Sequence, residues 1–279
     1  MPVKAIDVVS EEDVKQTLEV RTEQMYQFRR AYRDDDATDI NSGSKSFPQA
    51  VDDVRGAMDE VGEGADYPEA SMEYEGITAN YDKEGFIMRV SDEAVDDSVF
   101  DVIMDVTEQM GVAAEKRLDA KAFSLLDPNG ANNLNGDGPI GTDGSDLNFT
   151  SLVDGYTTLV EDEFVPSDFE VYCSPDGWGD LAKDDNFNRA TDQGDALARN
   201  GMLAEGFGMN IAMTNTGDLG DDEAIIVDTG RYGYESTRWD REVSSEYDFD
   251  NDETKYKVRT RNDYVVMKPE AGIFLQGGV

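Results

Sequence analysis

The stretch Gly85–Leu126, GFIMRVSDEAVDDSVFDVIMDVTEQMGVAAEKRLDAKAFSLL, decides the fold. Its first apolar run, Phe86–Val90, is typical of a strand. Ser91 and the acids after it form the capping signal of a helix. Apolar residues then recur every three or four positions, which predicts one amphipathic helix over residues 92–126. At 1.5 Å per residue this rod would be about 50 Å long, which is unusual in an ordinary globular domain.

Upstream of this stretch the pattern predicts helices over residues 10–33 and 47–61. A strand over 72–81 follows, and we expect it to pair with the strand at 86–90 as a long hairpin around the turn at 82–85.

Downstream, a polar loop over 127–147 leads to a helix over 148–162. A short helix is expected around Trp178, and a hairpin turn at 250–253. Strands are expected at 169–173, 209–213, 223–227, 243–249, 255–261, 264–267 and 273–275. This order predicts the α+β class with mixed sheets.

Composition excludes several kinds of chemistry. The chain has 279 residues with no His and a single Cys, Cys173. A Ser–His triad, a His-ligated metal, an internal disulfide and a Cys-only zinc site are therefore excluded. Cys173 lies in an apolar strand and is interpreted as a small buried hydrophobe. No apolar run is long enough to cross a membrane, and we expect no signal peptide.

The charge is strongly acidic, with 62 Asp plus Glu against 24 Lys plus Arg, a formal net charge of −38. A compact monomer of this mass would expose about 11,900 Å², so net charges would lie about 18 Å apart. The Debye length is about 8 Å at physiological salt and about 3 Å at 1 M, so molar salt would remove most of the repulsion. Because 12 Tyr, 12 Phe and 11 Met can build a core, the composition favours a folded, salt-adapted protein over a disordered acidic chain.

The polar loop offers the candidates for a metal site, Asp127 and Asp137. The loop lacks the EF-hand pattern, because Ala131 and Asn132 stand where a ligand and a glycine are needed. A loose cation site and a plain exposed loop both remain open. Pairs of carboxylates elsewhere do not indicate an acid–base catalytic site, because Asp and Glu occur along the whole chain. The segment Gly136–Gly141 has the spelling of a dinucleotide-binding loop, but it follows no strand and opens no helix.

Four stretches, taken in order, resemble segments of the major capsid proteins of tailed double-stranded DNA viruses, and the acidity points to a virus of a haloarchaeon. They are Val61–Pro68, Gly85–Ser98, Val171–Phe187 and Asn200–Asn215. The resemblance covers roughly residues 40–279.

The resemblance implies a fold with five parts. These are an N-terminal arm (1–57), an extended hairpin loop (58–90), a peripheral domain with a long spine helix (91–147), an axial domain (148–231) and return strands (232–279). It also implies hexamers and pentamers that close into an icosahedral shell around double-stranded DNA. Portal and turret or cement proteins would be partners, with no cofactor, catalysis or membrane. The protein would be assembled in the host cytoplasm and reside in the virion.

Two sets of basic residues are candidate contacts. Arg29, Arg30 and Arg33 form the densest basic cluster, which could pair with nearby acids or contact DNA or a neighbouring subunit. Lys83 lies near the tip of the predicted hairpin. The resemblance implies a contact with a neighbouring subunit there, because some relatives cross-link a lysine of this loop to a neighbour's asparagine. A solvated turn lysine is the alternative.

Two other functions remain as alternatives, a halophilic cation-dependent hydrolase and a cell-surface protein. No residues stand out above the acid background as those of a hydrolase. The missing secretion signal argues against the cell surface.

Overall fold

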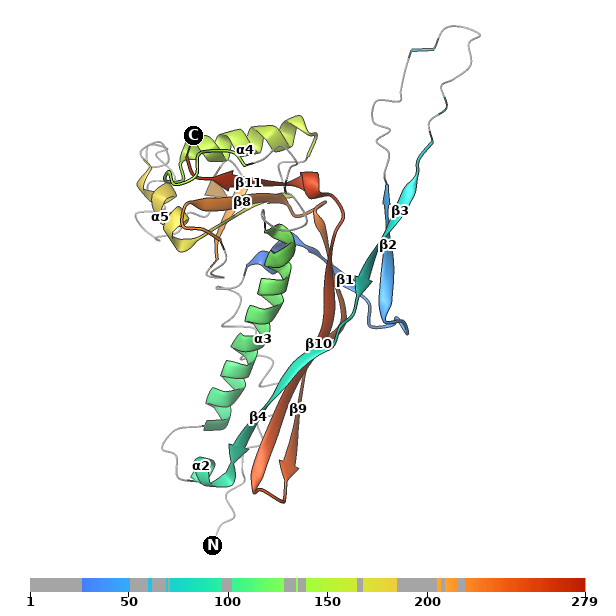
Figure 1. The fold of residues 1–279 in the computed structure, drawn as a ribbon, viewed down its shortest axis with the longest axis vertical. Coiled ribbons are helices and arrows are strands. Elements are labelled where there is room, and N and C mark those ends of the chain that lie inside the picture. The colour runs from blue at the N-terminus through green and yellow to red at the C-terminus, as the bar shows by residue number, and fades with distance from the viewer. Residues whose placement is uncertain are drawn as a thin grey trace.

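A computed structural model describes residues 27–50, 60–61, 69, 71–96, 102–127, 134, 139–164, 168–184, 205–206, 209–214 and 219–278. The chain forms a two-part body with a narrow ribbon projecting from it (Figure 1). Its elements are η1 (Phe28–Ala31), β1 (Arg33–Asp36), β2 (Ser44–Ala50), β3 (Tyr74–Asn80), β4 (Glu84–Ser91), α2 (Asp92–Asp96), α3 (Val102–Leu126), α4 (Phe149–Glu161), β5 (Phe169–Cys173), α5 (Pro175–Lys183), β6 (Glu205–Gly206), β7 (Met209–Met213), β8 (Glu223–Asp228), β9 (Gly233–Asp248), β10 (Glu253–Val266), η3 (Pro269–Ala271) and β11 (Gly272–Gln276).

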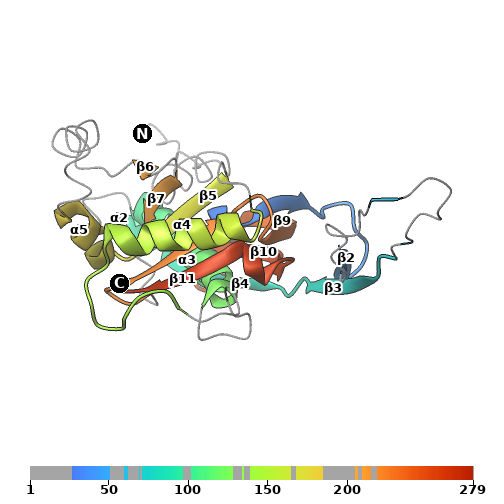
Figure 2. The same ribbon diagram turned by 90° about the horizontal axis from the view of Figure 1, so that it is seen from above.

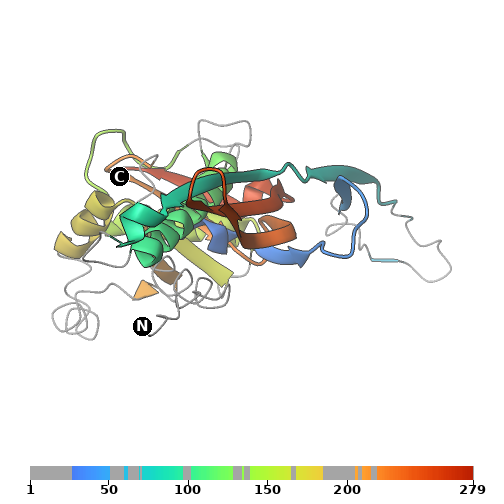
Figure 3. The same cartoon turned by 90° about the horizontal axis from the view of Figure 1, so that it is seen from below.

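One part of the body is a long four-stranded sheet in the order β1-β9-β10-β4. β9 and β10 are antiparallel, β4 is antiparallel to β10, and the short β1 is parallel to β9. Side chains alternate between the two faces of a strand, and Val258, Thr260 and Asn262 of β10 are buried on the face that packs against α3. Figure 1 shows α3 running beside this sheet, and Figure 3 gives the view from below.

The other part is a five-stranded sheet in the order β11-β8-β5-β7-β6, which α4 crosses (Figure 2). Asn148 caps α4 by accepting a hydrogen bond from the amide of Ser151 at 3.0 Å. Leu152 and Leu159 are fully buried, and burying each stabilises the fold by about 2 kcal/mol. A Cβ on Gly155 would lie 2.8 Å from Cδ1 of Ile226, so this glycine allows the helix to approach the sheet closely.

The projecting ribbon consists of β2 and β3, paired antiparallel from Ser44 opposite Asn80 to Ala50 opposite Tyr74. Its root packs on the long sheet through a small core that contains Phe47, Ala79 and Tyr81. Phe47 stacks on Tyr234 of β9, with ring centroids 5.4 Å apart.

The predicted hairpin of 72–81 with 86–90 is wrong. β3 pairs with β2, and β4 pairs over its whole length with β10, about 170 residues further along the chain. The residues read as a turn include Gly85, which is part of β4 and lies opposite Arg259. A Cβ there would lie inside van der Waals contact with the Val258 carbonyl, so the glycine serves close strand approach rather than a turn.

The two helices predicted over 10–33 and 47–61 are also wrong in the parts that the structure describes. Residues 47–50 of the predicted helix 47–61 form the end of β2, and 51–59 lie outside the described residues. Of the predicted helix 10–33, residues 10–26 lie outside the described residues, 28–31 form the turn η1, and Arg33 begins β1. The backbone of Tyr32 is extended, which ends the turn. Its ring is buried, and its hydroxyl donates to the Ala122 carbonyl at 2.9 Å.

The remaining predicted elements need smaller changes. The rod predicted over 92–126 is described as α2 and α3, with residues 97–101 outside the described part, and α3 alone is about 37 Å long. The strands predicted at 255–261 and 264–267 are one strand, β10, with an irregular register between Arg259 and Asn262. β9 begins at Gly233, ten residues before the predicted start. Helix α4 and strands β5, β7, β8 and β11 are confirmed.

Candidate assembly surfaces

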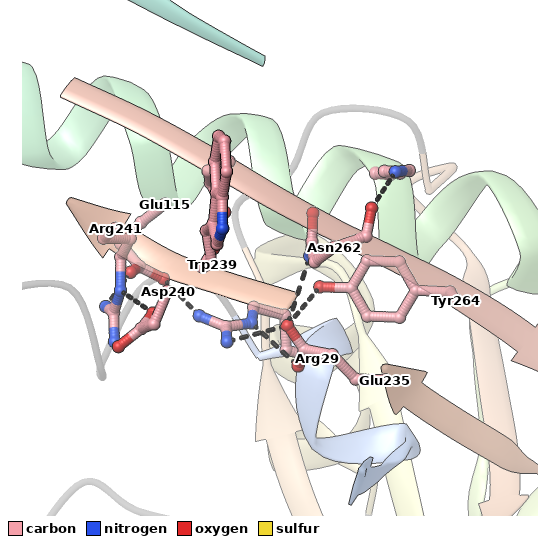
Figure 4. A network of polar contacts seen from close by, with 10 residues as sticks. Arg29, Glu115, Glu235, Trp239, Asp240, Arg241, Asn262 and Tyr264 are labelled. Carbon is pink, nitrogen blue, oxygen red and sulfur yellow. Dashed lines mark hydrogen bonds and ion pairs between the residues drawn. The ribbon is translucent and has the colours of Figure 1, made fainter. Parts of the chain in front are cut away.

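Arg29 is at the centre of a buried polar network that joins η1, α3 and the long sheet (Figure 4). Its guanidinium donates to Glu115 at 2.9 Å and to both carboxylate oxygens of Glu235 at 2.9 and 3.2 Å. Glu115 also pairs with Arg241, and Glu235 accepts from Tyr264 and Asn262. The side chains of Glu115 and Glu235 are only 7% and 4% exposed, so two buried carboxylates face two guanidinium groups.

This arrangement shifts the pKa values of its members. Burial lowers the pKa of Arg29, but the Glu235 carboxylate, with Tyr264 and Glu115, more than offsets this and raises the pKa above its usual range. Burial, followed by the Glu235 charge, raises the pKa of Tyr264 well above its usual value. Both groups therefore keep their protons at all ordinary pH values, and the network is a permanent structural link.

The other two arginines of the predicted cluster lie apart from this network. Arg30 is half-exposed and pairs with Glu170 of β5 at 2.9 Å. Arg33 is exposed on β1. Arg29 and Arg30 therefore both pair with acids of the same chain. A contact of Arg30 or Arg33 with DNA or a neighbour stays a prediction.

Lys83 is exposed in the short link between β3 and β4. The predicted hairpin would place Lys83 at its tip. Because β3 and β4 do not pair with each other, Lys83 lies at the root of the ribbon instead. Figure 1 shows β3 and β4 following each other along nearly one line through this point.

The candidate metal residues are not brought together. Asp127 follows α3 directly, and Asp137 lies outside the described residues. Within the part of the chain that the structure describes, no group of three or more Asp, Glu or Cys side chains could hold a metal ion. No helix among the described residues is long and apolar enough to span a membrane.

Large apolar side chains are exposed at the extremities of the molecule. Phe249, at the tip of the β9–β10 hairpin, is 84% exposed, and Tyr74, at the far end of the ribbon, is 63% exposed. Ile87 on the long sheet is 54% exposed. Extended elements with exposed apolar residues suit contacts with other subunits.

Comparison with known proteins decides what this shape means. The model of a family described as phage capsid protein matches residues 76–273, more than two thirds of the chain. The chain belongs to the phage capsid protein family. No match is found among curated protein sequences.

Solved capsid structures share the fold at low sequence identity. The capsid protein of cyanophage P-SCSP1u has a TM-score of 0.67 and 14% identity, over 88% of this chain and 86% of that one. The protein of Microbacterium phage Oxtober96 has a TM-score of 0.65 and 15% identity, over 96% and 99%. The virus-like particle of Pyrococcus furiosus gives 0.57 and 13%, over 95% and 98%. The expected α+β fold of tailed-phage major capsid proteins is therefore confirmed.

Family and fold together make this a structural protein of the capsid shell, located in the virion, and not an enzyme. The sequence alone does not identify Glu115 and Glu235 as the partners of Arg29. Glu115 and Glu235 are two acids among 62, and only the crossing of η1, α3 and β9 brings them together.

Proposed function

We propose that this capsid protein self-assembles into hexamers and pentamers that form an icosahedral shell around double-stranded DNA, in a tailed virus that infects a haloarchaeon. The observation that carries the proposal is the extended architecture of a capsid-family chain. A ribbon that leaves the body and a sheet of long strands bury little within one subunit, so neighbouring subunits must cover them.

Adaptation to high salt follows from the net charge of −38. Acidic subunits repel one another in dilute buffer, and this repulsion opposes the apolar contacts between them. In molar salt the screening length falls to about 3 Å, which removes repulsion between neighbours but leaves apolar contacts intact. Assembly would therefore be favourable only in concentrated salt.

The five-part division into arm, extended loop, peripheral domain, axial domain and return strands is part of the proposal, with one change. β2 moves from the arm to the extended loop, because it pairs with β3. The shell would meet a portal protein and turret or cement proteins, enclose DNA without reading its sequence, and assemble in the host cytoplasm. Lys83 would contact a neighbouring subunit at the root of the ribbon rather than at its tip.

The test is electron microscopy and sedimentation of the purified full chain, at the same protein concentration, in 3 M and in 0.1 M KCl. We expect closed shells or rings of five and six in 3 M salt, which dissociate on dilution into 0.1 M. Assembly that is the same at both salt concentrations would contradict the electrostatic argument. Monomers in 3 M salt, even with the virus's other structural proteins added, would contradict the shell itself.

A further inference from the structure

Two short links carry the chain between the long-sheet part of the body, which includes α3, and the five-stranded part, which includes α4 and α5. Residues 229–232 lead from β8 to β9, and residues 267–271 lead from β10 to β11. The links lie side by side, because the Tyr232 carbonyl accepts hydrogen bonds from the amides of Met267 at 2.8 Å and Lys268 at 3.1 Å. Two adjacent short links form a narrow hinge, about which one part would rotate against the other.

Direct packing between the two parts is limited. Among the described residues, no helix or strand of the long-sheet part packs broadly against a helix or strand of the five-stranded part. The hydrophobic core is nevertheless continuous, because Phe123 and Leu126 at the end of α3 belong to the same cluster as the side chains of β5. The angle between the parts therefore depends on a few buried side chains where they meet.

Turn η1 fills the space between the end of α3 and β5. Phe28 is fully buried, and its ring centroid lies 4.7 Å from that of Phe123 of α3 and 5.6 Å from that of Tyr172 of β5. Figure 1 shows this blue segment, which precedes β1, between the upper end of α3 and the five-stranded sheet. A ring packed between both parts resists a rotation that closes the space, and it loses contacts in a rotation that opens it.

Polar contacts tie the same turn to each part separately. On the long-sheet side, the Phe28 amide donates to the buried carboxylate of Asp119 of α3 at 2.8 Å, and Arg29 adds its buried network. On the other side, Arg30 pairs with Glu170 of β5 at 2.9 Å. Three consecutive residues of η1 thus hold both parts of the body.

The two ties differ in strength. Arg29 is held by carboxylates that are only 7% and 4% exposed, whereas the Arg30 side chain is 55% exposed. Concentrated salt screens the exposed pair and leaves the buried network intact. In molar salt η1 therefore moves with the long-sheet part, and the contact of the Phe28 ring with Tyr172 determines the angle.

We propose that η1 is a brace that fixes the angle between the two parts of the subunit, and that Phe28 is the residue that sets this angle. The inference rests on the proposed function, in which each subunit meets its neighbours through both parts. A different angle within the subunit would then change the angle between adjacent subunits, and these angles together make the curvature of the shell. Phe28 would thereby select the size of the shell that closes.

The angle is measured by pulsed electron paramagnetic resonance between two spin labels on the full-length chain, at a protein concentration below the threshold for assembly. K116C on α3 and T157C on α4 place one label at an exposed position of each part, in a C173A background. We expect F28A to widen the distribution of label distances about twofold, because the brace no longer fills its space. L159A removes a buried side chain between α4 and its own sheet and should leave the width unchanged.

F28L gives the same test without a large cavity. Leucine keeps most of the apolar volume but not the ring, so F28L should widen the distribution in the same direction, and a folding defect of F28A cannot hide the result. Equal widths for F28L, L159A and the unsubstituted background would overturn the brace.

The shells give the second readout. In 3 M KCl we expect F28L to form shells of mixed diameter together with open sheets, and L159A to form shells of wild-type diameter, as seen by electron microscopy. A wider distance distribution with unchanged shell diameters would overturn the link between the brace and curvature. If the wild-type chain itself forms no shells, the proposed function fails and the claim about curvature fails with it, whereas the distance measurement still decides the brace.

Discussion

Replacing Arg29 by Met should destabilise the subunit far more than the loss of a surface arginine from an acidic protein would. The change keeps most of the volume of the side chain but leaves Glu115 and Glu235 without the cation that lies between them. Removing one partner of a buried ion pair typically costs about 3–5 kcal/mol, because a charge remains buried without compensation. Here Glu115 keeps Arg241, and Glu235 keeps its bonds from Tyr264 and Asn262. The loss should therefore fall at the lower end, about 3 kcal/mol.

The assay is denaturant or thermal unfolding at a fixed 2 M KCl, followed by tryptophan fluorescence, at a protein concentration below the threshold for assembly. For a chain of this length, 3 kcal/mol corresponds to a decrease in Tm of about 6 °C. The matched control is R30M, since Arg30 is half-exposed, pairs with Glu170 and donates to Gln27; its loss should stay below about 1 kcal/mol. A double-mutant cycle with E235Q should show coupling of about 2 kcal/mol.

Two results would refute this reasoning. If R29M and R30M lose the same stability, the burial of the Arg29 network has no energetic consequence. If the loss for R29M shrinks towards zero between 0.5 and 3 M KCl, the network is screened like a surface pair and is not buried in solution.

Two further predictions concern close packing and burial. G85A should destabilise the subunit by about 1–3 kcal/mol in the same unfolding assay, because the added methyl group would press on the Val258 carbonyl and lie 3.0 Å from the Cα of Arg259. G43A, where the methyl group would meet nothing within 4 Å, should be neutral or slightly stabilising, and equal effects of the two changes would contradict the tight pairing of β4 with β10. Burial raises the pKa of the Cys173 thiol to about 12, so it should resist a thiol reagent at pH 8 in the native protein and react within minutes after unfolding. Rapid modification of native protein would show that β5 opens readily.

Local sequence signals were sufficient to predict a helix or strand wherever the element carries its own cap or its own pattern of apolar residues. Asn148 is a capping residue, and Leu152 and Leu159 form an apolar face directly after it. These signals lie within a few residues of one another, so they predict α4 from the local sequence. The apolar runs of β5 and β8 identify strands buried on both faces, and their order with the neighbouring motifs supports the capsid resemblance. The acid excess is likewise a property of the sequence alone.

Tertiary structure decided the pairing of strands and the composition of the Arg29 network. β4 could pair locally with β3, but it forms eight registered backbone pairs with β10 instead. Pairing across about 170 residues leaves no local signal, and the same holds for Glu115 and Glu235 around Arg29. Capping and periodicity act over a few residues and can be seen in the sequence, whereas a choice among distant partners depends on the total area and charge that each arrangement buries.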